Sequence, residues 1–173
     1  MKLFLTGKPR CGKSTVIAKV IEILKRKGLK VGGFLTPEKR VGNKRIGFSV
    51  KDIYSGSEGV LASVEQKTGL VVGKYRVNLE GFESIAMPAL EFALKNCDLV
   101  CIDEIGKMEW FSSRFREKIR EVLASDKTVV AVVHREFAGE FKKYGEVVEV
   151  TIENREHLPE EIVRKVMSGS AQN

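Results

Sequence analysis

The chain has 173 residues, of which 43% are hydrophobic and 31% are charged, a balance typical of folded globular proteins rather than disordered ones. Its longest apolar runs span five or six residues, as at 128–133, far short of the ~20 that a membrane-spanning helix needs. The formal charge of +7 is concentrated in residues 1–50, where 13 lysines and arginines face only Glu22 and Glu38. These features argue against a membrane protein and favour a phosphate-bearing ligand, either a nucleotide or a nucleic acid.

The cysteines and the N-terminus bear on the cellular compartment. Cys11, Cys97 and Cys101 are odd in number and lack metal-ligand spacing, which is typical of free thiols in a reducing compartment. The first residues reach Gly7 at once and contain no long apolar segment of the kind that directs secretion. Because no repeat or linker divides the sequence, we expect a single domain over residues 1–173, located in the cytoplasm.

The N-terminal half alternates short strands with one amphipathic helix. A strand at Lys2–Thr6 is followed by apolar residues at helical spacing over 16–24, with Gly28 as the C-cap. Further strands are predicted at Val31–Thr36, Lys44–Ile53, Gly59–Gln66 and Val71–Val77. The turn-forming residues 54–57 join two of these strands into a β-hairpin.

The C-terminal half continues the alternation. A helix is predicted over 82–93, where Pro88 requires either a late start or a kink. Short apolar runs at Leu99–Ile102 and Val129–Val133 are typical of strands buried on both faces. Other predicted elements are helices over Phe111–Leu123, Arg135–Tyr144 and Pro159–Met167, and a last strand at Glu146–Ile152. The pattern predicts an α/β fold with a mostly parallel central sheet, an added β-hairpin near 44–66 and helices on both faces.

A phosphate-binding loop is the strongest motif. Residues Gly7–Thr15 (GKPRCGKST) match the Walker A pattern G-x-x-x-x-G-K-[ST], with an apolar strand before it and an amphipathic helix after it. The glycines let successive backbone N–H groups turn toward phosphate oxygens, and the helix N-terminus adds partial positive charge. We expect Lys13 to contact the β- and γ-phosphates and the Ser14 hydroxyl to coordinate Mg²⁺. The predicted nucleotide-binding residues are Gly7, Lys8, Pro9, Arg10, Cys11, Gly12, Lys13, Ser14 and Thr15.

An acidic pair supplies the partner that such a loop needs. Asp103 and Glu104 follow the apolar run 99–102, as expected where a parallel strand emerges at the ligand-binding edge of a sheet. We assign Asp103 to Mg²⁺, through water, and Glu104 to polarising the attacking water. A tandem Asp-Glu is typical of ATPases that carry their own catalytic carboxylate, and their sheets insert a strand between the loop strand and the Asp strand.

The same stretch also fits a second class of phosphate-loop protein. Residues 103–106 match the D-x-x-G pattern of GTP-dependent switch proteins. The N-K-x-D guanine clamp of those proteins is absent, because the only Asn-Lys, at 43–44, is followed by Arg-Ile. A guanine-specific switch is therefore disfavoured.

Several basic side chains are candidates for contacting the phosphates. Lys107 lies just past the acidic pair, His134 and Arg135 follow the apolar run 129–133, and Arg10 lies inside the loop. A well-aimed guanidinium is favoured as negative charge develops in phosphoryl transfer, and we take Arg135 as a candidate catalytic residue. Surface salt bridges are the alternative role for each.

The sequence resembles the small nucleoside-triphosphatase family first described from thermophiles, which has a cancer-related branch in animals. The resemblance covers nearly the whole chain. It rests on Gly7–Thr15, on Gly73–Asn78 with Phe82-Glu83 and Pro88, and above all on the heptad Asp103–Glu109 (DEIGKME). The resemblance implies a RecA-like P-loop fold and Mg²⁺-dependent hydrolysis of several nucleoside triphosphates to the diphosphate and phosphate.

One departure from the family concerns the loop. Arg10-Cys11 stands where relatives have Gly-Val. Because Arg10 prefers an ordinary backbone conformation where a glycine is usual, the departure bears on loop shape and on turnover.

We therefore predict a cytoplasmic nucleoside-triphosphatase that hydrolyses ATP, GTP, CTP and UTP with Mg²⁺ and weak base selectivity. A small-molecule or nucleotide kinase is the first alternative, favoured by the size and the loop, although no D-R-x lid signature follows the core strands. The second alternative is a nucleic-acid-binding module that uses ATP as a switch. The basic residues 1–50 favour it, but they lack the interleaved aromatic side chains that stack on bases. The sequence does not predict an oligomeric state.

Overall fold

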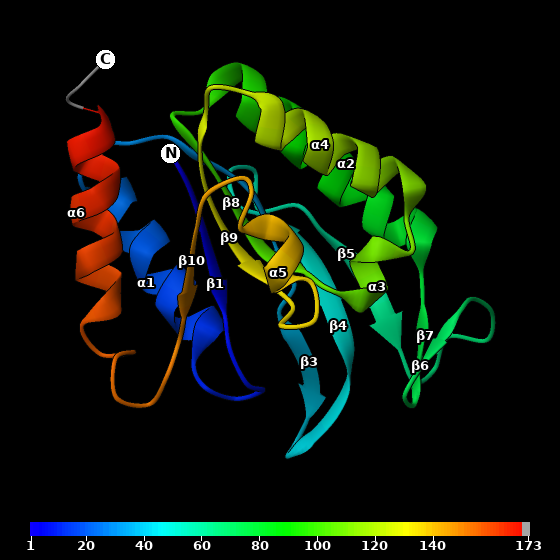
Figure 1. The fold of residues 1–173 in the computed structure, drawn as a ribbon. Coiled ribbons are helices and arrows are strands. Elements are labelled where there is room, and N and C mark those ends of the chain that lie inside the picture. Colours follow the sequence, from blue (N-terminus) through cyan, green and yellow to red (C-terminus); the bar gives the residue numbers. More distant parts are fainter. Residues whose placement is uncertain (171–173) are drawn as a thin grey trace.

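A ten-stranded sheet forms the centre of the structure, a computed structural model that describes residues 1–170 (Figure 1). The strands are β1 (Lys2–Thr6), β2 (Val31–Leu35), β3 (Glu38–Val41), β4 (Lys44–Asp52), β5 (Glu58–Ser63), β6 (Val71–Val72), β7 (Tyr75–Val77), β8 (Leu99–Ile105), β9 (Thr128–Val133) and β10 (Glu146–Glu149). The helices are α1 (Lys13–Arg26), α2 (Leu79–Asn96), α3 (Lys107–Trp110), α4 (Ser113–Ala124), α5 (Ala138–Phe141) and α6 (Leu158–Ser170).

One half of the sheet is parallel and carries the ligand-binding edge. Its strand order is β10-β1-β9-β8-β2, with each neighbouring pair parallel. The strand β9 lies between β1 and β8, which confirms the inserted strand predicted from the tandem Asp-Glu. Carboxyl ends of parallel strands meet at one edge of a sheet, so the loops after β1, β8, β9 and β10 gather there (Figure 1).

The other half is an antiparallel extension. The predicted hairpin is β4 and β5, whose turn is fixed by the Asp52 carboxylate accepting the N–H groups of Tyr54 and Ser55 at 2.9 and 3.1 Å. Two further hairpins were not predicted: β3 pairs with β4, and the extended segment expected over 71–77 is divided into β6 and β7. Gly42 and Gly73, with φ of 60° and 59°, form their turns, a conformation that favours glycine.

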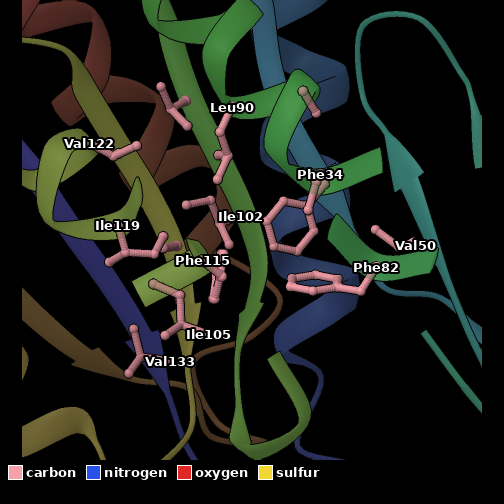
Figure 2. Close-up of a cluster of buried hydrophobic side chains, with 14 of the residues drawn as sticks. Phe34, Val50, Phe82, Leu90, Ile102, Ile105, Phe115, Ile119, Val122 and Val133 are labelled. Atoms are coloured by element: carbon pink, nitrogen blue, oxygen red, sulfur yellow. The ribbon is translucent and has the colours of Figure 1, made fainter. Parts of the chain in front are cut away.

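Helices cover both faces of the parallel half, as predicted, and each face has its own core (Figure 1). Helices α1 and α6 pack over one face through apolar residues such as Ile17 and Val163. Helices α2 and α4 pack over the other, where Phe34, Phe82 and Phe115 meet edge to face with ring centroids 5.2–5.7 Å apart (Figure 2). Such aromatic pairs contribute roughly 0.5–1.5 kcal/mol each beyond their buried area.

Several predicted boundaries were wrong, and side-chain caps explain two of them. Of the two alternatives expected for the Pro88 helix, a late start or a kink, the late start does not occur, because the Asn78 side chain accepts the Gly81 N–H at 2.9 Å and begins α2 early. The helix predicted over 111–123 is α4, which begins two residues later because the buried Ser112 hydroxyl accepts the Phe115 N–H. The short helix α3 that precedes it was not predicted.

The helix after β9 and the strand β10 are also shorter than expected. The helix predicted over 135–144 is limited to α5, because the Glu136 N–H donates to His134 Nδ1 in a turn that precedes it. The strand predicted to reach Ile152 ends at Glu149. In the part of the chain that the structure covers, residues 1–170, none of the helices has both the length and the apolarity to span a bilayer.

Candidate functional site

The phosphate loop joins β1 to α1. Gly7 and Gly12 have φ of 149° and 108°, and a Cβ on Gly7 would lie 2.7 Å from the Val150 carbonyl oxygen. Both positions therefore require glycine. Gly12 is the N-cap of α1 and has no side chain to occupy the first N–H groups of that helix. No cap side chain occupies those donors, so they could bind phosphate oxygens.

Arg10 adopts a left-handed backbone conformation, which glycine adopts more easily than other residues. Its φ is 63°, in the left-handed region, so the expectation of an ordinary backbone conformation at this position was wrong. The surrounding glycines and the packing of the loop fix the backbone path, so Arg10 is held in a left-handed conformation that is unfavourable for a residue with a side chain. A side chain in this region costs roughly 1–2 kcal/mol.

Lys13 lies against the backbone of its own loop. Its Nζ donates to the carbonyl oxygens of Gly7 and Lys8, both at 2.9 Å, and lies 3.9 Å from the Sγ of Cys11. The thiol is buried inside the loop, and a Cβ on Gly7 would lie 2.9 Å from its sulfur. The ammonium is thus held close to the N-terminus of α1, where a triphosphate would need it.

Asp103 and Glu104 belong to the last residues of β8, which runs three residues beyond the predicted strand. Asp103 is 7% exposed, and burial raises its pKa to about 6, opposed by a hydrogen bond from Ser14 and by the charge of Lys13. Burial, then the neighbouring Asp103 carboxylate, raises the pKa of Glu104 to about 7, again opposed by Lys13. The structure thus brings the four predicted key side chains together.

The donor set suits Mg²⁺. The Ser14 hydroxyl and the Asp103 carboxylate are hard oxygen ligands in hydrogen-bond contact with each other, and burial disfavours the charged form of Asp103 and Glu104, which a bound cation would stabilise. Among residues 1–170, no group of three or more His, Cys, Asp or Glu side chains could hold a metal. Mg²⁺ in phosphoryl-transfer sites uses one or two protein ligands together with substrate phosphates and water, so two ligands fit it.

A cavity of about 280 Å³ opens from these residues toward the antiparallel extension. Its lining combines polar and charged side chains, among them Ser14, Asp103, Glu104 and Glu38, with an apolar wall. The apolar wall is made by Phe48, Leu61 and Val72 of β4, β5 and β6 together with Met108. The extension therefore encloses the catalytic edge of the parallel half. A larger hollow of about 480 Å³ lies over α2 and α4 and contains none of the predicted site residues.

Glu109 is a functional candidate to which sequence reasoning gave no role. It is 3% exposed, lines the same cavity, and its Oε2 accepts the Gly106 N–H at 3.1 Å. A Cβ on Gly106 would lie 2.5 Å from Glu104 Oε1 and 2.8 Å from Glu109 Oε2, so the two carboxyl groups flank this glycine. Burial, then the charge of Glu104, raises the pKa of Glu109 well above its usual range. The only sequence feature that could have indicated a role for Glu109 was its place in the DEIGKME heptad.

The basic candidates are placed differently from one another. Lys107 and His134 line the cavity, and the Lys107 ammonium pairs with Glu136 at 3.0 Å. Burial lowers the pKa of His134. Arg135 and Arg10 are exposed, and neither contributes to the wall of the cavity.

A second arginine near the loop was missed by sequence reasoning. Arg155 follows β10, and its Cδ would lie 3.1 Å from a Cβ on Gly12. Its Nη1 donates to the Cys11 carbonyl oxygen at 3.5 Å. Because 144 residues separate the two in sequence, no local pattern could have indicated the contact.

The chain is similar to known proteins over nearly its whole length. The profile of a family described as NTPase matches residues 2–163. Nucleoside-triphosphatase THEP1 of Methanocaldococcus jannaschii is 44% identical over 169 residues, covering 98% of this chain and 99% of the relative. This chain belongs to the NTPase family. The prediction of an enzyme that hydrolyses nucleoside triphosphates is thereby confirmed.

Solved structures of NTPase family proteins have the same fold. THEP1 from the hyperthermophile Aquifex aeolicus is 32% identical with a TM-score of 0.83, covering 96% of this chain and 99% of that one. A human cancer-related nucleoside triphosphatase is 37% identical with a TM-score of 0.81, covering 96% and 97%. These matches confirm the predicted α/β P-loop fold.

Proposed function

We propose that this protein is a Mg²⁺-dependent nucleoside-triphosphatase that releases phosphate from ATP, GTP, CTP and UTP. The observation that carries the proposal is the convergence of Lys13, Ser14, Asp103 and Glu104 at one edge of the sheet. Family membership supports the same activity. We further propose that residues 1–173 act as a single domain. We place the protein in the cytoplasm, since all three cysteines are free thiols.

The mechanism divides the work between the loop and the acidic pair. The N–H groups of the loop and of the first turn of α1 bind the phosphate oxygens, and Lys13 neutralises charge between the β- and γ-phosphates. Ser14 and Asp103 would hold Mg²⁺, which supplies further charge neutralisation on those phosphates when bound.

Glu104 orients the attacking water and accepts its proton as the oxygen attacks the γ-phosphorus. A carboxyl with a pKa of about 7 is matched to that task near neutral pH. In this account Glu109 is a positioning residue, because its hydrogen bond to the Gly106 N–H fixes the turn that follows Glu104. Arg135 remains a proposed contact to the γ-phosphate, and Arg135→Ala should lower turnover if the contact is made.

We expect weak selectivity among the bases, because the groups that recognise the nucleotide contact its phosphates. The loop, Lys13 and the metal ligands all read phosphates, which every nucleoside triphosphate shares. A buried polar site built for one base rejects others by several orders of magnitude. We expect kcat/KM for the four nucleotides to agree within about tenfold, and a thousandfold preference in competition assays would contradict the proposal.

A kinase is the second candidate, favoured by the apolar wall of the cavity. An apolar wall is not needed when the attacking group is water. In a kinase, Phe48, Leu61 and Val72 could contact the apolar part of an acceptor molecule whose hydroxyl lies next to Glu104. In that case phosphate would be transferred to the acceptor instead of being released.

Phosphate release from each nucleotide tests the proposal directly. The assay is run with nucleotide alone, then with nucleosides as acceptors, then with RNA or DNA. Lys13→Ala should abolish release because it removes the charge on the β- and γ-phosphates while leaving the backbone cradle. Near-wild-type turnover by a folded Lys13→Ala variant, or release only with an acceptor or nucleic acid present, would contradict a simple triphosphatase.

A further inference from the structure

The strand order indicates where the nucleoside must lie. Asp103 and Glu104 are on β8, so they mark the γ-phosphate end of a bound triphosphate. The phosphate loop follows β1, and β10 is the neighbour of β1 on the side away from β8. A triphosphate chain held along the loop therefore points its nucleoside toward the segment after β10. Figure 1 shows that segment (orange) and the loop (blue) at the same edge of the sheet.

Arg155 is the cationic side chain of that segment that contacts the loop. Its aliphatic part packs on Gly12, and its Nη1 donates to the Cys11 carbonyl oxygen at 3.5 Å. The side chain is nevertheless 39% exposed, and its nearest acidic partner, Glu156, is 3.9 Å away on the protein surface. The guanidinium thus has one anchored edge and an accessible remainder.

The turn that carries Arg155 is fixed by hydrogen bonds. The Asn154 Oδ1 accepts the Thr151 N–H at 2.8 Å, and the Asn154 amide donates to the Glu149 carbonyl oxygen at 2.8 Å. The Arg155 N–H donates to the Thr151 carbonyl oxygen at 3.0 Å. Because this turn is attached to the end of β10, the backbone at Arg155 is held in place before any ligand binds, which lowers the entropy lost on binding.

We propose that Arg155 forms the nucleobase subsite, with its guanidinium plane stacked against the base. This proposal rests on the proposed function. A guanidinium is planar and stacks on aromatic faces, and every base offers such a face. Stacking therefore contributes to affinity without selecting a base. Arg155 would add nucleoside affinity to a site whose other contacts all read phosphates.

Binding titrations of Mg·NTP and of inorganic tripolyphosphate separate this role from a phosphate contact. Arg155→Ala should weaken the binding of all four nucleotides by about five- to tenfold, the range expected for a partly exposed cation–π contact. Tripolyphosphate has no base, so its affinity should stay within twofold of wild type. Arg164→Ala, on an exposed arginine of α6, is the matched control for lost charge and should change neither affinity.

The Arg155→Lys variant separates loss of the planar guanidinium from loss of the contacts that Arg155 makes with the loop. Lysine keeps the aliphatic packing on Gly12 and a donor for the Cys11 carbonyl oxygen but lacks the planar group, so it should behave like the alanine variant toward nucleotides. Equal losses for tripolyphosphate and nucleotides would overturn the proposal, as would unchanged nucleotide affinity. So would a loss confined to one base. Because the readout is binding, a wild-type protein that binds but does not hydrolyse nucleotides would contradict the proposed function alone.

Discussion

Replacing Glu104 by glutamine should stabilise the metal-free protein, and the gain should depend on pH. The pKa of Glu104 is raised from 4.5 to about 7 by burial and by Asp103. A carboxyl whose folded pKa lies above its unfolded pKa favours folding when protonated, so its contribution is fully present below pH ~4.5. That contribution is lost as the pH rises through the folded pKa. Glutamine has no charge to lose.

The magnitude follows from the shift. One pKa unit corresponds to about 1.4 kcal/mol, so the shift amounts to about 3 kcal/mol when it is fully expressed. Between pH 5 and pH 8 most of it is expressed, and the advantage of Glu104→Gln in unfolding free energy should grow by about 2–3 kcal/mol. For a chain of this size that is roughly 4–12 °C in Tm.

Thermal and urea unfolding at pH 5 and pH 8, in EDTA and without nucleotide, measure this difference. Comparing the two pH values removes any effect of the substitution that does not involve ionisation. Glu117→Gln, on an exposed glutamate of α4, is the control and should show no pH-dependent gain. An equal Tm change at both pH values, or a loss of stability at pH 8, would refute the reasoning.

Three further predictions concern the loop and its metal ligand. Arg10→Gly should raise the unfolding free energy by about 0.5–1 kcal/mol in urea titrations, because relief of the left-handed strain exceeds the cost of the added flexibility of the unfolded chain. A lower unfolding free energy would show that the Arg10 side chain makes contacts that outweigh the strain. Asp103→Asn should raise the Mg²⁺ concentration needed for half-maximal turnover, and an unchanged titration would remove Asp103 as a ligand. Cys11 should be alkylated faster than Cys97 and Cys101, because burial raises the pKa of both other thiols, that of Cys101 to about 12. Mg·ATP should slow that labelling in peptide mass spectrometry, whereas equal rates at saturating nucleotide would show that the Cys11 sulfur faces away from the ligand.

The predictable parts of the site are those encoded within a few residues. Gly7–Thr15 combines its motif with the strand and helix that flank it, and the tandem Asp103-Glu104 implied the strand inserted between β1 and β8. The exposed strand β3 was missed because its residues show no alternation of apolar and polar side chains. The hairpin of β6 and β7 depends on a single glycine turn.

Other parts depend on contacts that no local pattern encodes. Arg155 reaches the loop only because β10 pairs with β1, so its contact with Cys11 required the folded sheet. Glu109 stood inside a recognised heptad, yet its burial against Gly106 and its proximity to Glu104 follow from the turn between β8 and α3. Arg10 shows the opposite case, in which the surrounding loop overrides the preference of one residue.

The central claim is that Glu104 activates water while the other groups bind the nucleotide. Parallel measurement of Mg·ATP affinity and of single-turnover phosphate release in Glu104→Gln tests it most directly. The amide keeps the size of the side chain but loses the charge that accepts a proton, so release should slow by about 10²–10⁴-fold while affinity changes by less than about threefold. Release at the wild-type rate, or a loss of affinity that accounts for the whole defect, would contradict the account.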